Sequence, residues 1–209
     1  MQTKVRAIKS VAGVEGDVKM TEGGALHGAP LSLVWTAKGY GFQAISTGAV
    51  ASLVVRPSTT SAITLYNGEA GGGKIYVIER VFAFQLVSTA AAGFHSIWLC
   101  VHPVNMTAPT GNNITVRNST RGKAAGGSSS VLDTAEAVTD DGWFPWGPIL
   151  QVEATGVLPG GILDAEINGR IMVPPGAGLS VQVVGAVVGN TFTHGILWFE
   201  VPQSELGLD

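Results

Sequence analysis

Residues 162–201 read ILDAEINGRIMVPPGAGLSVQVVGAVVGNTFTHGILWFEV and decide the fold class. The segment contains three runs rich in Val, Ile, Leu, Thr and aromatic residues, at 162–173, 179–188 and 191–201. Residues 174–178 (PPGAG) separate the first two runs and Gly189-Asn190 separates the last two, and both separators are typical of tight turns. We therefore expect three successive strands that form a meander.

The same pattern of short strands and turns extends through most of the chain. Further strand-like runs lie at 31–36, 48–55, 62–66, 74–87, 94–101 and 113–117. Gly, Pro and Asn clusters separate them, as in the glycine-rich turn at 67–73. No window of a dozen residues carries a helical apolar stripe free of Gly, Pro or β-branched residues. The sequence predicts an all-β, antiparallel, jelly-roll-like β-sandwich.

The chain has 209 residues, which suits one sizeable β domain better than two. Residues 1–30 are Gly-rich and weakly patterned, so we expect an extended N-terminal arm followed by a single domain at 31–209. Residues 121–130 (RGKAAGGSSS) are too short and too central for a linker, and predict an exposed loop. The arm is expected either to pack on its own subunit or to reach a neighbour.

Composition excludes several classes of function. The net charge is −3 and the 12 Lys and Arg residues are scattered, which argues against a nucleic-acid partner. No apolar stretch has membrane-spanning length and no apolar N-terminal leader is present, so we expect synthesis in the cytoplasm and no membrane partner. Cys100 lies alone in an apolar run and predicts a buried thiol without a disulfide.

Charged residues make up 13% of the chain, against roughly 25% in an ordinary domain. They are absent from residues 81–116 and again from 171–199. Strands with one solvated face normally alternate apolar with charged or polar side chains. We interpret the two stretches as surfaces buried against other copies of the chain, where an unpaired charge is costly. The alternative is that they form central strands buried on both faces within one subunit.

Candidate catalytic and metal-binding residues do not form a recognisable pattern. The histidines are His27, His95, His102 and His194, and their spacing predicts structural roles. The acidic candidates are Asp133, Glu136, Asp140, Asp141, Glu153, Asp164 and Glu166. No spaced calcium-loop pattern is present among them, and nothing in the sequence singles out a catalytic pair. The run Gly71-Gly72-Gly73-Lys74 lacks the spacing of a phosphate loop. We therefore expect no enzymatic activity, no cofactor and no metal.

One aromatic cluster stands out as a candidate ligand-binding surface. Trp143, Phe144 and Trp146 lie within four residues, with Pro145 between the last two. Aromatic side chains bind sugars by stacking, and they also anchor cores and protein interfaces. Packing in the core or at a subunit contact and binding of a ligand therefore both stay open for this cluster.

Two combinations of strand and turn resemble structural proteins of tailed-phage virions. One is Thr64-Leu65-Tyr66-Asn67-Gly68 followed by 73–81 (GKIYVIERV), and the other is 171–179 (IMVPPGAGL) followed by 195–202 (GILWFEVP). In such jelly-roll proteins a Gly-Lys turn leads into a long strand and a Pro-Gly turn precedes the closing hairpin. The resemblance covers about residues 60–202.

The resemblance implies a capsid-decorating, head-fibre or tail-associated protein, commonly a homotrimer, located in the virion and docked on major capsid or tail proteins. The first functional hypothesis is therefore a virion structural protein that self-assembles. The second is a carbohydrate- or receptor-binding β-sandwich module that uses Trp143, Phe144 and Trp146.

Overall fold

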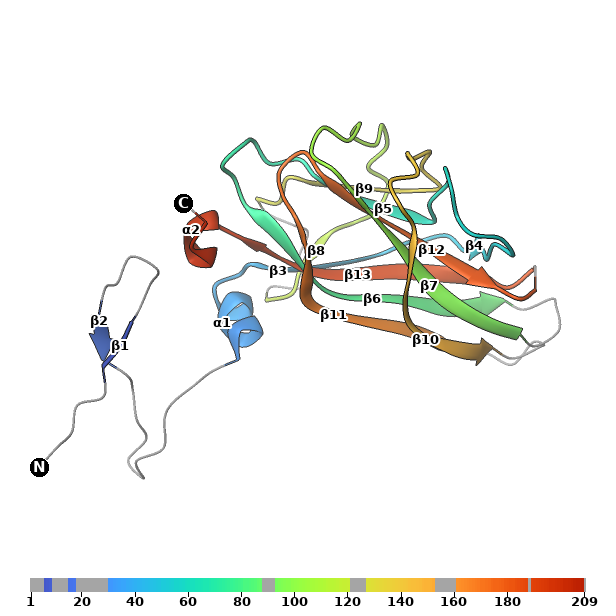
Figure 1. The fold of residues 1–209 in the computed structure, drawn as a ribbon, viewed down its shortest axis with the longest axis horizontal. Coiled ribbons are helices and arrows are strands. Elements are labelled where there is room, and N and C mark those ends of the chain that lie inside the picture. The colour runs from blue at the N-terminus through green and yellow to red at the C-terminus, as the bar shows by residue number, and fades with distance from the viewer. Residues whose placement is uncertain are drawn as a thin grey trace, which may run out of the picture.

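The computed structural model describes residues 6–8, 15–17, 30–87, 93–120, 127–152, 161–187 and 189–208. Two antiparallel sheets pack face to face, with two short helices at one end (Figure 1). The fold is an all-β sandwich, as the strand and turn pattern predicts.

The six-stranded sheet has the order β11-β6-β13-β3-β8, with β4 beside β13. Its strands are β3 (Gly41–Ile45), β4 (Val50–Ala51), β6 (Ile75–Val87), β8 (Arg117–Asn118), β11 (Ile162–Val173) and β13 (Thr191–Val201). The five-stranded sheet has the order β10-β7-β12-β5-β9. Its strands are β5 (Ile63–Asn67), β7 (Gly93–His102), β9 (Ser130–Thr134), β10 (Phe144–Val152) and β12 (Gly178–Gly185).

Eight of these strands pair as a jelly roll. The first half of the domain pairs with the second half in reverse order: β3 with β13, β5 with β12, β6 with β11, and β7 with β10. Folding this long antiparallel ribbon over on itself places alternate pairs in opposite sheets. The two sheets then enclose one large core, in which the most deeply buried side chains include Tyr76, Phe192, Ile196 and Trp198.

The prediction of a meander at 162–201 is wrong, although all three strands are present. β11 and β13 lie on either side of β6, and β12 lies in the other sheet. The turns at Pro174–Ala177 and around Gly189 therefore carry the chain between layers instead of joining neighbours. Short turn sequences are compatible with either connection, so the turn residues alone do not determine the pairing.

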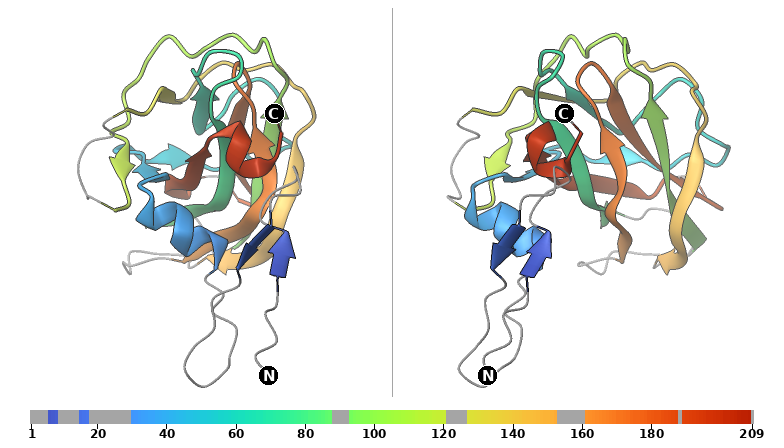
Figure 2. Two further views of the ribbon diagram at one scale, coloured as in Figure 1. Left: turned by 90° about the vertical axis from the view of Figure 1, so that its left-hand side faces the viewer. Right: turned by 60° about the vertical axis from the view of Figure 1, so that its left-hand side comes forward.

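The prediction of a strand at 31–36 is also wrong, because Leu31–Ala37 form helix α1. The helix begins after Pro30, and its one buried side chain, Trp35, packs against Phe199 with ring centroids 5.4 Å apart. Tertiary packing of this aromatic pair overrides the strand propensity of Leu, Val, Trp and Thr. A second short helix, α2 (Gln203–Leu206), follows β13 at the same end (Figure 2).

Two further predicted strands are much shorter than expected. The segment 48–55 pairs only at Val50–Ala51, with β13, and then Leu53 bridges Val184 of β12. It therefore crosses from one sheet to the other and cannot continue in either. The segment 113–117 joins its sheet only at Arg117–Asn118, beside β3.

The predicted N-terminal arm is described only in part. Arg6–Ile8 (β1) and Glu15–Asp17 (β2) pair as a two-stranded antiparallel hairpin. The remainder of residues 1–29 lies outside the described residues, as do 121–126 of the predicted loop at 121–130. The end of that loop is anchored, since Ser130 is buried and begins β9.

The interior contains one histidine whose ring nitrogens make no hydrogen bond within the described part of the chain. His194 follows Phe192 and precedes Ile196 on the inward face of β13, and it is fully buried. Burial lowers the pKa of His194 to about 4, from an ordinary value of 6.5. Burial also lowers the pKa of His95, which packs beside Phe192.

The lowered pKa of His194 predicts acid sensitivity of the fold. Between pH 6.5 and 4 the unfolded chain binds a proton at this histidine and the folded chain does not, so the free energy of unfolding falls as the pH drops. The expected loss across this window is about 3 kcal/mol from His194. Urea denaturation at pH 7 and pH 4.5 measures it, and His194→Phe should flatten the dependence. An unchanged slope in that variant would contradict the assignment.

Candidate functional site

A groove runs along one side of the sandwich, where the edge strands of the two sheets meet. β10 ends the five-stranded sheet and β11 ends the six-stranded sheet. The two edge strands lie close together at Gly147, whose φ is +89° and where an added Cβ would lie 3.1 Å from the Asp164 carbonyl oxygen. A side chain at this position would therefore push the two edge strands apart. The groove holds about 610 Å³ and is lined by Phe144, Pro145, Trp146, Gly147, Asp164, Glu166 and Arg170.

Two aromatic rings form the wall contributed by β10. Phe144 exposes 63% of its surface, whereas Trp146 is half-buried and packs against the main core. Their ring centroids are 6.4 Å apart and the rings are nearly perpendicular, at 71°. The guanidinium of Arg170, from β11, lies 5.3 Å from the centroid of the Trp146 ring. The inward-facing ring thus fixes a cation in the groove while the outer ring stays open to solvent.

Charged side chains of β11 form the opposite wall. Arg80 on the neighbouring strand β6 binds Asp164 through two hydrogen bonds, of 2.6 and 2.7 Å. Arg170 donates to the backbone carbonyls of Ile167 (2.9 Å) and Glu166 (2.6 Å), which holds its guanidinium in place. The Glu166 side chain is exposed. The wall therefore presents carboxylate acceptors and guanidinium donors in balanced number, and most of them are fixed by other contacts.

The third aromatic residue of the predicted cluster does not line the groove. Trp143 is buried with Cys100 and Val138 in a small cluster separate from the main core. Its Nε1–H donates to the Ser58 carbonyl at 2.8 Å. Cys100 is a buried free thiol, as expected. Of the predicted site residues the structure thus brings together Phe144 and Trp146 and separates Trp143 from them.

The described histidines lie apart from one another, and two of them, His95 and His102, make structural hydrogen bonds. His102 contacts the Asp141 carboxylate at 2.7 Å and the Ser180 hydroxyl at 2.8 Å, and His95 contacts the Gly93 carbonyl at 3.0 Å. His27 lies outside the described residues. Within the described ranges, no three His, Cys, Asp or Glu side chains gather in a way that could hold a metal ion.

The acidic candidates are likewise dispersed. Asp140 pairs with Arg56, and this pairing lowers the pKa of the Asp140 carboxyl. Burial, followed by the charge of Asp133, raises the pKa of Glu136. Asp164 and Glu166 are the two that reach the groove, and Glu153 lies outside the described residues.

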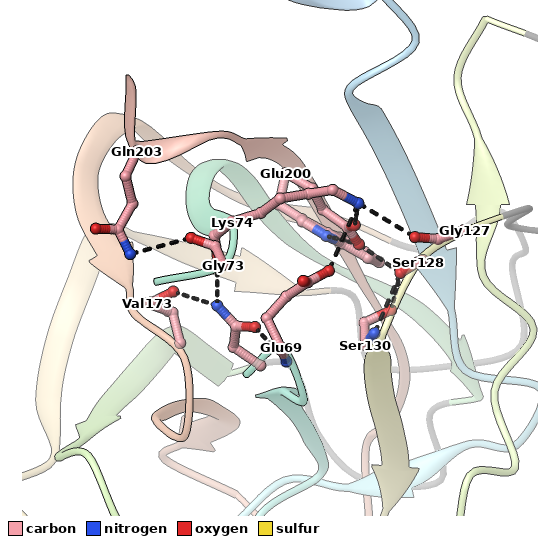
Figure 3. Close-up of polar contacts among 11 residues, drawn as sticks. Glu69, Gly73, Lys74, Gly127, Ser128, Ser130, Val173, Glu200 and Gln203 are labelled. Atoms are coloured by element: carbon pink, nitrogen blue, oxygen red, sulfur yellow. Dashed lines mark hydrogen bonds and ion pairs between the residues drawn. The ribbon is translucent and has the colours of Figure 1, made fainter. Parts of the chain in front are cut away.

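A buried charged cluster closes the end of the sandwich near α2 (Figure 3). The Glu200 side chain is completely buried, and one carboxylate oxygen accepts hydrogen bonds from the Ser128 hydroxyl and from Trp198 Nε1–H, the latter at 3.3 Å. Lys74 Nζ lies 3.5 Å from the other oxygen of Glu200 and 3.5 Å from Glu69. Burial raises the pKa of the Glu200 carboxyl, and the Ser128 bond and the Lys74 charge oppose that rise.

Lys74 also fixes the chain that enters β9. Its ammonium donates to the Gly127 carbonyl at 3.2 Å, while Gln203 of α2 donates to the Gly73 carbonyl at 3.0 Å. The cluster therefore connects three distant segments of the chain at one end of the fold, as Figure 3 shows. Every charge in it has a protein partner, which favours a structural role over a catalytic one.

Among the described residues, side chains of α1 and α2 cover the outer face of the six-stranded sheet at one end only. Trp35 of α1 and Leu206 of α2 pack over Ile75, Val77 and Phe199. Farther along, the side chains of Ile45 and Ile162 are each 49% exposed, near the β3 and β11 edges respectively. A hollow of about 450 Å³ lies on this uncovered part. It is lined by Gln43, Ala44, Ile45, Thr47, Phe82, Thr115, Arg117 and Leu197.

The charge-free stretch 171–199 has an explanation within one subunit. β12 and β13 each lie between two other strands, and most of their side chains on both faces are buried. The alternative interpretation, of central strands buried on both faces, therefore accounts for the absence of charge there. The stretch 81–116 differs, since Phe94, Val101 and Val104 within it are exposed.

No known protein-family model matches the chain, and no curated protein is significantly similar to it. Among the helices in the described ranges, none has the length and apolar character needed to cross a membrane.

The Glu200 cluster predicts a large difference between two acidic substitutions near α2. Glu200→Ala leaves the buried Trp198 Nε1–H without its acceptor and removes one of the two carboxylates beside Lys74, and should lower the free energy of unfolding by about 2 kcal/mol. Glu205→Ala removes only an exposed ion pair with Lys38 and should leave the free energy of unfolding nearly unchanged. Urea midpoints compare the two variants, and Glu200→Gln should fall between them. Equal midpoints for Glu200→Ala and Glu205→Ala would refute the structural role.

Proposed function

We propose that this protein is a virion structural protein that self-associates and docks on a phage capsid or tail. The resemblance of residues 60–202 to phage jelly-roll proteins supports the location, and implies a trimer as the state of association. The observation that supports the self-association is the set of residues at the two edges of the uncovered outer face of the six-stranded sheet.

One row of residues crosses this face from edge to edge. The pairing registers place Glu166, Arg80, Leu197, Gln43 and Arg117 side by side on five neighbouring strands. Glu166 and Arg117, at the two ends of the row, are both exposed. This row therefore ends in a carboxylate at the β11 edge and in a guanidinium at the β8 edge.

Each charged edge also carries a half-exposed isoleucine. Ile162 lies on the β11 edge strand together with Glu166, and Ile45 lies on β3, next to the β8 strand that carries Arg117. A ring of copies that places the β11 edge of one against the β8 edge of the next would bury both isoleucines and pair both charges. Such a head-to-tail contact forms a ring where its rotation closes, and a ring of three copies is the trimer that the resemblance implies.

Charge exchange tests this contact. Glu166→Arg and Arg117→Glu each place like charges opposite one another at every contact, and should reduce the mass in solution toward that of the 21.5 kDa chain. The double variant restores the pairing in reversed order and should recover the oligomer. Light scattering coupled to size exclusion measures the mass of all three.

Aspartate substitutions at two exposed hydrophobic residues provide the matched control. Ile45→Asp should dissociate the oligomer, whereas Val55→Asp, at a residue exposed to 66% but outside the proposed contact, should leave the mass unchanged. A wild-type protein that remains a monomer at high concentration would refute self-association. Dissociation by both single charge variants without recovery in the double variant would refute this pairing of edges.

A further inference from the structure

We propose that the groove between β10 and β11 is a binding site for a neutral saccharide, with the open face of Phe144 as the stacking platform. This inference shares Glu166 and the β11 edge with the proposed self-association but concerns a different kind of partner. It rests on three features of the groove: an exposed aromatic ring, polar groups held in place before any ligand arrives, and a balance of charge.

The exposure of Phe144 is the first feature. A phenyl ring with 63% of its surface open to water contributes little to the core, yet it lies against a concave surface and beside a second aromatic ring. The C–H groups on one face of a pyranose ring form an apolar patch of similar size, and burying the two against each other releases water from both. Trp146 offers less free surface, because it packs on the core and beneath Arg170.

The polar groups form the second feature. Asp164 is held by Arg80, and Arg170 is held by two backbone carbonyls and by the Trp146 ring. Carboxylate oxygens accept hydrogen bonds from sugar hydroxyls, and a planar guanidinium donates hydrogen bonds to neighbouring hydroxyl oxygens. Groups already fixed by the protein lose little conformational entropy when they bind.

The charge balance indicates the class of saccharide. Asp164 and Glu166 supply two negative charges near the groove, and Arg80 and Arg170 supply two positive charges. Neither a sialylated nor a sulfated sugar gains a net electrostatic attraction from such a site. A hexose with only hydroxyl groups satisfies both the donors and the acceptors without bringing a charge that needs a partner.

The test uses the purified chain on an array that presents neutral, sialylated and sulfated oligosaccharides, followed by calorimetry with the neutral oligosaccharide retained best. Phe144→Ala should weaken that binding about tenfold or more, which corresponds to about 1.4 kcal/mol. Phe94→Ala is the matched control, because Phe94 is 59% exposed on β7 and is not among the groove-lining residues. Arg170→Lys keeps the charge but loses the planar fork, and should also weaken binding.

Several outcomes would overturn the proposal: no retained oligosaccharide, retention only of acidic ones, or equal affinities of Phe144→Ala and Phe94→Ala. If Phe144→Ala changes the mass in solution and leaves saccharide binding intact, the ring is a subunit contact instead. The mass and the saccharide affinity are separate measurements, so failure of this site is distinguishable from failure of the proposed self-association.

Discussion

The jelly roll depends on burying two strands, β12 and β13, on both of their faces. Each lies near the middle of its sheet, so its hydrogen bonds and its side chains all meet protein. This constraint explains why Ser180, Gln182 and Thr193 occupy positions where a surface strand would have lysine or glutamate. Ser180 is satisfied by His102 and Thr64, and Thr193 by Ser46. Neutral polar groups can be paired in this way at a low cost, whereas a charge at such a position needs a buried counter-charge.

The one buried carboxylate in β12 and β13, that of Glu200, is likewise paired with other protein groups, at the end of the fold. Glu200 is accommodated because Lys74 reaches it from β6's start and Ser128 reaches it from the chain before β9. His194 is the exception, since it is buried without a hydrogen-bond partner among the described residues. The interior thus contains polar residues that connect distant segments by hydrogen bonds, and also His194, which is accommodated in its neutral form.

The sequence predicted the fold class because turn residues and strand propensities are local, and they agree along most of the chain. The pairing of the strands is harder to predict from the sequence. The turns at Pro174–Ala177 and Gly189 look alike whether they join neighbouring strands or carry the chain between sheets. Leu31–Ala37 has strand-like composition, yet it is helical and packs Trp35 on Phe199, a tertiary contact that no local pattern shows. Within the aromatic cluster, the alternation of side chains along a strand separates the three residues. Phe144 and Trp146 are two residues apart and share a face, while Trp143 precedes them on the other. Arg170 lines the groove because β11 is the sheet edge that lies beside β10, and no local sequence pattern specifies that arrangement.

The pairing of the first half of the domain with the second half has a consequence for biosynthesis. β13 is the last strand of the chain, yet it lies between β6 and β3 and supplies Phe192, Ile196 and Trp198 to the core. Until that strand leaves the ribosome, β3 has no partner on that side and β6 exposes an open edge. Such non-local topology folds slowly, and its incomplete forms present unpaired edges to one another. Folding of this domain therefore waits for β13, and β3 and β6 present unpaired edges to other chains until that strand is in place.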